Sequence, residues 1–265
     1  MELAQLCQKV TQLTKNTGLF IKEESLKNKQ VVSKGKNDFV TQVDKASEER
    51  LVAGLSELLP EAGFIAEEGT SDKVGEKYNW IIDPIDGTTN FIHGLFPFAI
   101  SIALQDKNDI VLGVVYEVGL DECFYTWKGA PAYLNGKEIS VSKASKVADS
   151  LIATGFPYSD FAKMKGFMNS LDYFMKNSHG LRRLGSAATD LAYVACGRFE
   201  GFYEYGLKPY DVAAGAFLVQ QAGGDNCDFS GGEDYIFGQE IISSNSAIFN
   251  EFKEVVNQLM KKDIE

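Results

Sequence analysis

Two aspartates stand three residues apart at the end of an apolar run in WIIDPIDGTTNF, and Gly-Thr-Thr follows them directly. An apolar strand that ends in Asp83 and Asp86 can hold two carboxylates at its tip. The glycine turn behind them can expose backbone N–H groups to an anion. This combination indicates phosphate chemistry, and the alternative is that the two aspartates only cap a turn.

Three kinds of phosphate chemistry use a motif of this type. Haloacid-dehalogenase-type phosphatases need a second aspartate two residues after the nucleophile, but the residue two before Asp86 is Pro84. Sugar kinases of the actin-like class use Asp-x-Gly-Thr-Thr, whereas Asp86 and Gly87 are adjacent. The third chemistry holds two or more Mg²⁺ ions on several carboxylates and uses a water molecule as the nucleophile.

Further carboxylates that could complete a metal site occur elsewhere in the chain. Glu67 and Glu68 end the short apolar run FIA, and Asp211 stands in the first turn of an expected helix in KPYDVAAG. Each is ambiguous by itself, because a Glu-Glu pair after a strand is usually solvated and an aspartate before a helix is usually an N-cap.

Composition limits the classes of protein that need consideration. A chain of 265 residues with 45% hydrophobic content can bury a large core without disulfides. A net charge of -11 disfavours direct contact with nucleic acid, so a phosphorylated ligand needs local positive groups or metal ions. The N-terminus lacks the apolar core of a signal peptide, and no stretch reaches the ~20 apolar residues that span a bilayer. We therefore expect a soluble, cytoplasmic protein without a membrane partner. Its four widely separated cysteines suggest neither a zinc site nor a redox motif.

The pattern of elements predicts an α+β / α/β protein. Helical spacing in MELAQLCQKVTQLTKNTG and VDKASEERLVAGLSELLP predicts two N-terminal helices, the second stopped by Pro60. GFIA and YNWIID are predicted as short buried strands, and the strands joined by Asp, Asn and Gly turns after them predict a mainly antiparallel first half. From Ser150 strands, the last of them EIISSN, alternate with helices, which predicts layered α/β. We expect one domain over 1–265, with subdomains of approximately 1–145 and 146–265 that share a site.

Four ordered motifs resemble those of the inositol monophosphatase family, within the superfamily of lithium-sensitive, Mg²⁺-dependent phosphatases. WIIDPIDGTTNF is similar to the D-P-x-D-G-T signature, and KPYDVAAGAFLVQQAGG is similar to the second signature. KGKNDFVTQVD and IAEEG resemble the flanking motifs. The resemblance covers nearly the whole chain and implies a layered αβαβα sandwich of the sugar-phosphatase type.

The resemblance also implies a metal site with two to three Mg²⁺ ions, in which Asp83 bridges two ions. Its ligands would be Glu67, Asp83, the main-chain carbonyl of Ile85, Asp86 and Asp211. Glu67 and Thr88 would orient or deprotonate the attacking water, and Asp44 matches the aspartate that pairs with the threonine hydroxyl. Lys34 matches a lysine near this site, although Lys36 is close enough to blur the assignment.

The resemblance extends to substrate contacts. Glu204, seven residues before Asp211, matches a glutamate that bonds a sugar-alcohol hydroxyl. The full set of expected substrate contacts is Asp86, Gly87, Thr88, Gly185, Ser186, Ala187, Glu204 and Asp211. One departure is Tyr210, where the second signature normally has tryptophan.

These observations predict a Mg²⁺-dependent phosphomonoesterase that acts on a small phosphorylated polyol, myo-inositol monophosphate, and that forms a homodimer. The alternatives are the same chemistry on fructose 1,6-bisphosphate, histidinol phosphate or 3'-phosphoadenosine 5'-phosphate. A binding or regulatory role is a third hypothesis, since a relative in this family also acts in RNA-polymerase complexes.

Overall fold

A computed structural model describes residues 2–27, 31–35, 38–158 and 160–261, and for 31–35 and 38–40 it describes the backbone alone. The expected N-terminal helices are α1 (Leu3–Ser25) and α2 (Gln42–Leu58). A hairpin that the sequence analysis did not predict, β1 (Val31–Gly35) and β2 (Asp38–Thr41), separates them. Helix α2 begins with a capping box between Thr41 and Asp44, and it ends two residues before Pro60.

A seven-stranded sheet follows, and only its first pair of strands is parallel. In spatial order the strands are β3 (Gly63–Ala66), β4 (Tyr78–Asp86), β5 (Ala99–Asp106), β6 (Asp109–Glu117), β7 (Glu122–Trp127), β8 (Ala132–Leu134) and β9 (Lys137–Ile139). The short helix α3 (Thr88–His93) begins directly after β4. The first half is therefore mainly antiparallel, as predicted.

The second sheet has five strands in the order β11-β10-β12-β14-β13. These are β10 (Leu151–Thr154), β11 (Gly180–Arg182), β12 (Gly201–Tyr205), β13 (Gly224–Cys227) and β14 (Glu240–Asn245). Strand β10 pairs in parallel with β11 and β12, whereas β14 is antiparallel to both of its neighbours. The 3-10 turn η1 (Val147–Asp149) precedes this sheet, and its helices are α4 (Met164–Asn177), α5 (Ala187–Ala195), α6 (Pro209–Gln221) and α7 (Phe249–Met260).

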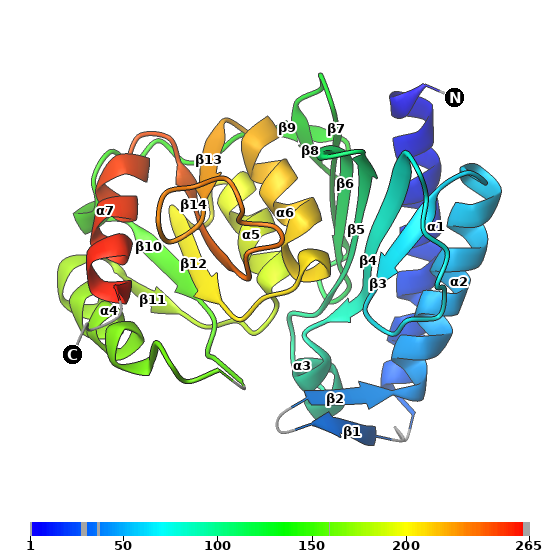
Figure 1. The fold of residues 1–265 in the computed structure, drawn as a ribbon, viewed down its shortest axis with the longest axis horizontal. Coiled ribbons are helices and arrows are strands. Elements are labelled where there is room, and N and C mark those ends of the chain that lie inside the picture. The colour runs from blue at the N-terminus through cyan, green and yellow to red at the C-terminus, as the bar shows by residue number, and fades with distance from the viewer. Residues whose placement is uncertain (1, 28–30, 36–37, 159, 262–265) are drawn as a thin grey trace.

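Helices and sheets stack in five layers, which confirms the predicted αβαβα sandwich (Figure 1). Helices α1 and α2 cover one face of the seven-stranded sheet, and α4 and α7 cover the outer face of the five-stranded sheet. Helices α5 and α6 lie between the two sheets. Because α6 has protein on both sides, eight consecutive residues from Val212 to Val219 are buried.

Within the described ranges, none of the helices is both long enough and apolar enough to cross a lipid bilayer.

Candidate active site

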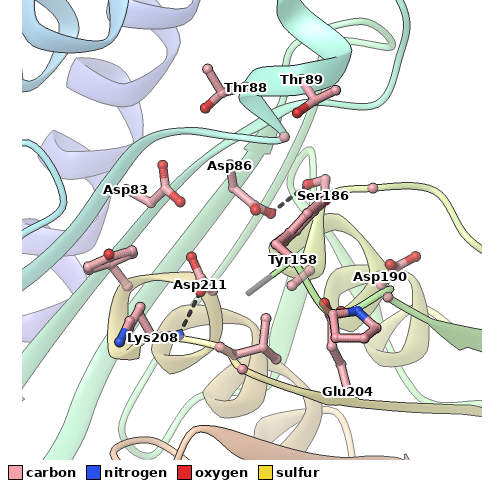
Figure 2. A pocket seen from close by; sticks show the side chains of 18 of the residues that line it. Asp83, Asp86, Thr88, Thr89, Tyr158, Ser186, Asp190, Glu204, Lys208 and Asp211 are labelled. Carbon is pink, nitrogen blue, oxygen red and sulfur yellow. Dashed lines mark hydrogen bonds between the residues drawn. The ribbon is translucent and has the colours of Figure 1, made fainter. Parts of the chain in front are cut away.

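Three aspartates meet where the tip of β4 faces the first turn of α6. Carboxylate oxygens of Asp83, Asp86 and Asp211 all lie within 4.8 Å of one another. Figure 2 shows the three side chains pointing toward a common centre. In a regular strand, residues three apart point to opposite faces. The pairing of β4 with β5 shifts register between Asp83 and Asp86, and this irregularity lets both carboxylates reach one place.

Hydrogen bonds from the second half of the chain fix two of these aspartates. The Ser186 hydroxyl donates to Asp86 Oδ2 at 2.6 Å, and the Ala188 N–H donates to the same oxygen at 2.7 Å. Asp211 Oδ2 accepts the Lys208 N–H at 2.6 Å, so Asp211 closes the N-terminus of α6 while it also faces the cluster. The capping role and the site role are therefore compatible in the same residue.

Burial raises the pKa of all three carboxyl groups. The pKa of Asp83 lies well above its ordinary value, because burial is reinforced by the negative charges of Glu67, Asp86 and Asp211. Burial raises the pKa of Asp86 to about 6, against the opposing hydrogen bonds from Ser186 and Ala188. Burial and the charge of Asp86 raise the pKa of Asp211 to about 7. Several carboxylates that share one buried site, and whose pKa values stay raised although Arg183 and Lys208 oppose the shift, fit a divalent cation. An all-oxygen ligand set suits Mg²⁺.

Glu67 and Thr88 line the same pocket from two further elements. Glu67 follows β3, and its N–H donates to the Ile82 carbonyl at 3.2 Å, which places it beside the strand that carries Asp83. Thr88 is the first residue of α3, and its hydroxyl lies 3.2 Å from Asp44 Oδ1 and 3.0 Å from the Ile85 carbonyl oxygen. The structure therefore brings Asp44, from the start of α2, to the hydroxyl that the family motif pairs with it.

The glycine turn behind Asp86 has a backbone that requires glycine. Gly87 has φ 95°, in the left-handed region, and a Cβ there would lie 3.0 Å from the Gly185 carbonyl oxygen. The Asn90 amide strengthens this contact between the two halves by donating to the carbonyls of Pro97 and Leu184. Gly185 and Ala187 line the pocket on either side of Ser186, the N-cap of α5.

The pocket has a volume of about 440 Å³ and continues from the three aspartates to Glu204 on β12. Glu204 is 8% exposed, and burial, together with the charges of Asp211 and Asp86, raises its pKa well above the ordinary value. Figure 2 shows Glu204 and Asp190 apart from the three aspartates, on the side formed by the second half of the chain.

Asp190, Arg183 and Tyr158 also line the pocket, and the sequence analysis missed them. Asp190 is 1% exposed, and its Oδ1 has no hydrogen-bond partner among the described residues. The signal for it was a charged residue inside the apolar helix AATDLAYVA. Arg183 donates to the Tyr158 hydroxyl, and its charge opposes the raised pKa of both Asp190 and Glu204.

Two predicted features need separate comment. Lys36 and the side chain of Lys34 lie outside the described residues. Tyr210, which replaces the usual tryptophan, accepts a hydrogen bond at its backbone carbonyl from the Ser101 hydroxyl at 2.8 Å. This bond ties the first turn of α6 to β5, and it is independent of the side chain at position 210.

The sequence model of the inositol monophosphatase family matches residues 2–263. The chain belongs to the inositol monophosphatase family. Among similar family proteins, an inositol-1-monophosphatase from Mesorhizobium japonicum is 41% identical over 224 residues, covering 84% of each chain. A putative Nus factor SuhB from Neisseria meningitidis serogroup B is 40% identical over 226 residues, covering 85% of this chain and 87% of the relative.

The fold agrees with this family assignment. The solved structure of an IMPase from Thermotoga maritima is 36% identical and superimposes with a TM-score of 0.86, covering 94% of this chain and 95% of the other. Membership of the family supports a phosphatase, and the cluster of Asp83, Asp86 and Asp211 could hold a metal ion.

Proposed function

We propose that the protein is a Mg²⁺-dependent phosphomonoesterase that hydrolyses myo-inositol monophosphates to inositol and phosphate. The observation that carries this proposal is one pocket of about 440 Å³ that joins the three-aspartate cluster to the buried carboxylate of Glu204. The first group suits a cation that binds phosphate, and the second suits the hydroxyls of a polyol.

In this proposal two to three Mg²⁺ ions are held by Glu67, Asp83, the Ile85 carbonyl, Asp86 and Asp211. Bound Mg²⁺ would place positive charge beside the phosphoryl oxygens. It would also lower the pKa of a bound water molecule, so that this water can lose a proton at neutral pH. The chain itself orients that water. Because the Thr88 hydroxyl donates its hydrogen bond to Asp44, the Thr88 oxygen keeps a lone pair that can accept a hydrogen bond from the attacking water.

Glu67 lines the same pocket and would take the other proton of the water as its oxygen attacks phosphorus. The bond between phosphorus and the inositol oxygen would break, that oxygen would take a proton from solvent water to become an alcohol, and Glu67 would release its proton to solvent. The backbone N–H groups of Gly87 and Thr88 are assigned to the phosphate oxygens in this scheme.

Substrate choice would depend on the part of the pocket formed by the second half of the chain. Glu204 would accept a hydrogen bond from an inositol hydroxyl, and Gly185, Ser186 and Ala187 would form the adjacent wall. The alternatives within the same chemistry are fructose 1,6-bisphosphate, histidinol phosphate and 3'-phosphoadenosine 5'-phosphate. We also propose inhibition by millimolar Li⁺, a cytoplasmic location and a homodimer, on the ground of family membership.

The relatives named Nus factor SuhB favour a second candidate function, which is binding to a transcription complex. The two functions are compatible, since the site lies in a pocket and leaves most of the surface available. Pull-down of RNA polymerase by wild-type protein and by a phosphatase-inactive variant would separate them. Equal binding by both would support a binding role that does not need catalysis, and no binding by either would exclude it.

The test of the phosphatase is release of inorganic phosphate from a panel of the four substrates named above. We expect the highest kcat/KM for inositol 1-phosphate, loss of activity in excess EDTA and its recovery on addition of Mg²⁺. Full activity in EDTA would contradict the proposed metal site. A higher kcat/KM for another substrate of the panel would replace inositol phosphate as the proposed substrate.

A further inference from the structure

Helix α2 carries two fully buried carboxylates, Asp44 and Glu48, four residues apart. Residues at this spacing lie on the same face of a helix, one turn from each other. Asp44 contacts the Thr88 hydroxyl, as described above. Glu48 has no place in the family motifs used above, and it does not itself line the pocket.

Glu48 holds the segment that follows β3 by two main-chain hydrogen bonds. Its Oε2 accepts the Glu68 N–H at 2.8 Å, and its Oε1 accepts the Thr70 N–H at 2.9 Å. On the other side, the Glu67 N–H is bonded to the Ile82 carbonyl of β4. The backbone is therefore fixed on both sides of the Glu67 side chain, although this residue lies just beyond the end of its strand.

We propose that Glu48 is a positioning residue that sets the Glu67 carboxylate for the metal ion and the attacking water. This inference rests on the proposed function. One turn of α2 then fixes both groups assigned to the water: Asp44 orients Thr88, and Glu48 orients the segment of Glu67. Their relative position is set by the rigid helix between Asp44 and Glu48 and not by the loop itself.

The two bonds require a carboxylate. An ionised glutamate accepts a hydrogen bond at each oxygen, whereas a glutamine amide has one oxygen and directs its NH₂ group at a main-chain N–H. Glu48→Gln keeps the shape of the side chain and loses one of the two bonds. Glu48→Asp keeps both acceptors on a side chain that is one carbon shorter.

The chain offers a matched control in Glu117, which is 1% exposed. Its two carboxylate oxygens accept the Gly119 N–H at 3.0 Å and the Leu120 N–H at 2.5 Å, at the turn between β6 and β7. Glu117 does not line the pocket. Glu117→Gln thus removes the same kind of interaction from a loop that carries no proposed ligand.

The experiment measures Mg²⁺ affinity by calorimetry for wild type, E48Q, E48D and E117Q, together with amide exchange of residues 68 and 70 in EDTA. We expect E48Q to speed exchange at the amide that loses its acceptor and to weaken Mg²⁺ binding by about 10–100-fold, the usual cost of losing a residue that orients a metal ligand. E48D should fall between wild type and E48Q. E117Q should lower the melting temperature. Because Glu117 shares no hydrogen-bond partner with the proposed metal ligands among the described residues, its replacement should leave Mg²⁺ affinity within about twofold of wild type.

The outcomes separate this inference from the proposed function. If wild type binds Mg²⁺ and E48Q binds it equally well despite faster exchange, Glu48 is a structural residue only and the inference is wrong. If E48Q does not fold, E48D is compared with wild type instead, and equal Mg²⁺ affinity of the two proteins shows that the inference is wrong. If E117Q weakens Mg²⁺ binding as much as E48Q does, the effect is general loosening, and the inference again fails. Wild type that binds no Mg²⁺ would overturn the proposed function itself and this inference with it.

Discussion

The Glu204 carboxylate occupies the space that a side chain at position 155 would need. A Cβ on Gly155 would lie 1.9 Å from Glu204 Oε1 and 2.1 Å from Oε2. Gly155 follows the last residue of β10, and β10 is the parallel neighbour of the strand that carries Glu204. The absence of a side chain at this position is what admits the glutamate to the pocket.

Replacement of Glu204 should remove the proposed hydrogen bond between its carboxylate and a substrate hydroxyl. Loss of a hydrogen bond to a charged group costs ~1.5–3 kcal/mol, which corresponds to roughly 10- to 150-fold in kcat/KM. We expect Glu204→Gln to lower kcat/KM for inositol 1-phosphate by this factor and to change little for an aryl phosphate without hydroxyls. Equal losses on both substrates would show that Glu204 supports the reacting groups, and no loss on either would favour the alternative substrates.

Gly155→Ala should reproduce that selectivity without touching the glutamate. The added methyl group must displace the Glu204 carboxylate, because real Cβ atoms do not approach other atoms this closely. We expect most of the Glu204→Gln loss on inositol 1-phosphate and near-normal rates on the aryl phosphate. The double variant should add little to either single one, since both remove the same interaction. Additive losses would mean that position 155 acts by another route.

Asp83→Asn tests the cluster of three aspartates. Asp83 is proposed to bind two metal ions. The loss of activity in Asp83→Asn should therefore exceed the roughly 10–100-fold loss caused by changing a residue that only orients a metal ligand. Two controls bracket the result: Lys34→Ala, which we expect to lose less, and Asp109→Asn, which only breaks an exposed ion pair with Lys128. Steady-state rates over a range of Mg²⁺ concentrations provide the measurement. Losses of similar size in Asp83→Asn and Lys34→Ala would show that the metal ligands are wrongly assigned.

Asp190 should make the metal-free protein less stable as the pH rises. Burial, followed by the charges of Glu204 and Asp86, holds its pKa well above the ordinary 3.8. Above pH 3.8 the unfolded chain loses this proton while the folded chain retains it, so the free energy of unfolding falls until the folded pKa is passed. Asp190→Asn lacks this penalty, which is about 1.4 kcal/mol for each unit of pKa shift.

We therefore expect Asp190→Asn to melt at a higher temperature than wild type in EDTA, with a difference that grows as the pH rises above about 4 and becomes constant once the folded pKa is passed. Thermal melts at several pH values give the measurement, and Asp225→Asn at a partly buried position on β13 is a suitable comparison. A difference that is constant with pH would mean that Asp190 does not titrate as a buried carboxyl.

Local sequence patterns were enough to predict most of the helices and strands and to single out the aspartates of the cluster. The strands GFIA and EIISSN have the predicted bounds, because each contains buried apolar residues in a short stretch between turns. Strand β4 runs past the predicted YNWIID to Asp86, because pairing with β5 continues across the irregularity between Asp83 and Asp86. Spacing alone could not show that continuation.

The residues that the sequence did not reveal are those whose partners lie far along the chain. Glu48 accepts hydrogen bonds from main-chain N–H groups 20 and 22 residues away, and nothing near it in the sequence indicates that it is their acceptor. Asp190 gave one local signal, a charge inside an apolar helix, and Arg183 gave none. Nothing in either segment shows that the two residues line one pocket with Glu204, because that depends on how distant elements pack. Glu204 was found through its spacing from Asp211, which a family motif supplies and physical chemistry does not.

The segment Pro209–Gln221 brings Asp211 to the tip of β4 and also fills the space between the two sheets. During translation the N-terminal helices and the first sheet leave the ribosome before this segment does. Until it emerges, the first sheet has one uncovered apolar face and two aspartates without their third partner. The same step in synthesis hides that surface and completes the acidic cluster, so the cluster exists only in a chain whose core is closed.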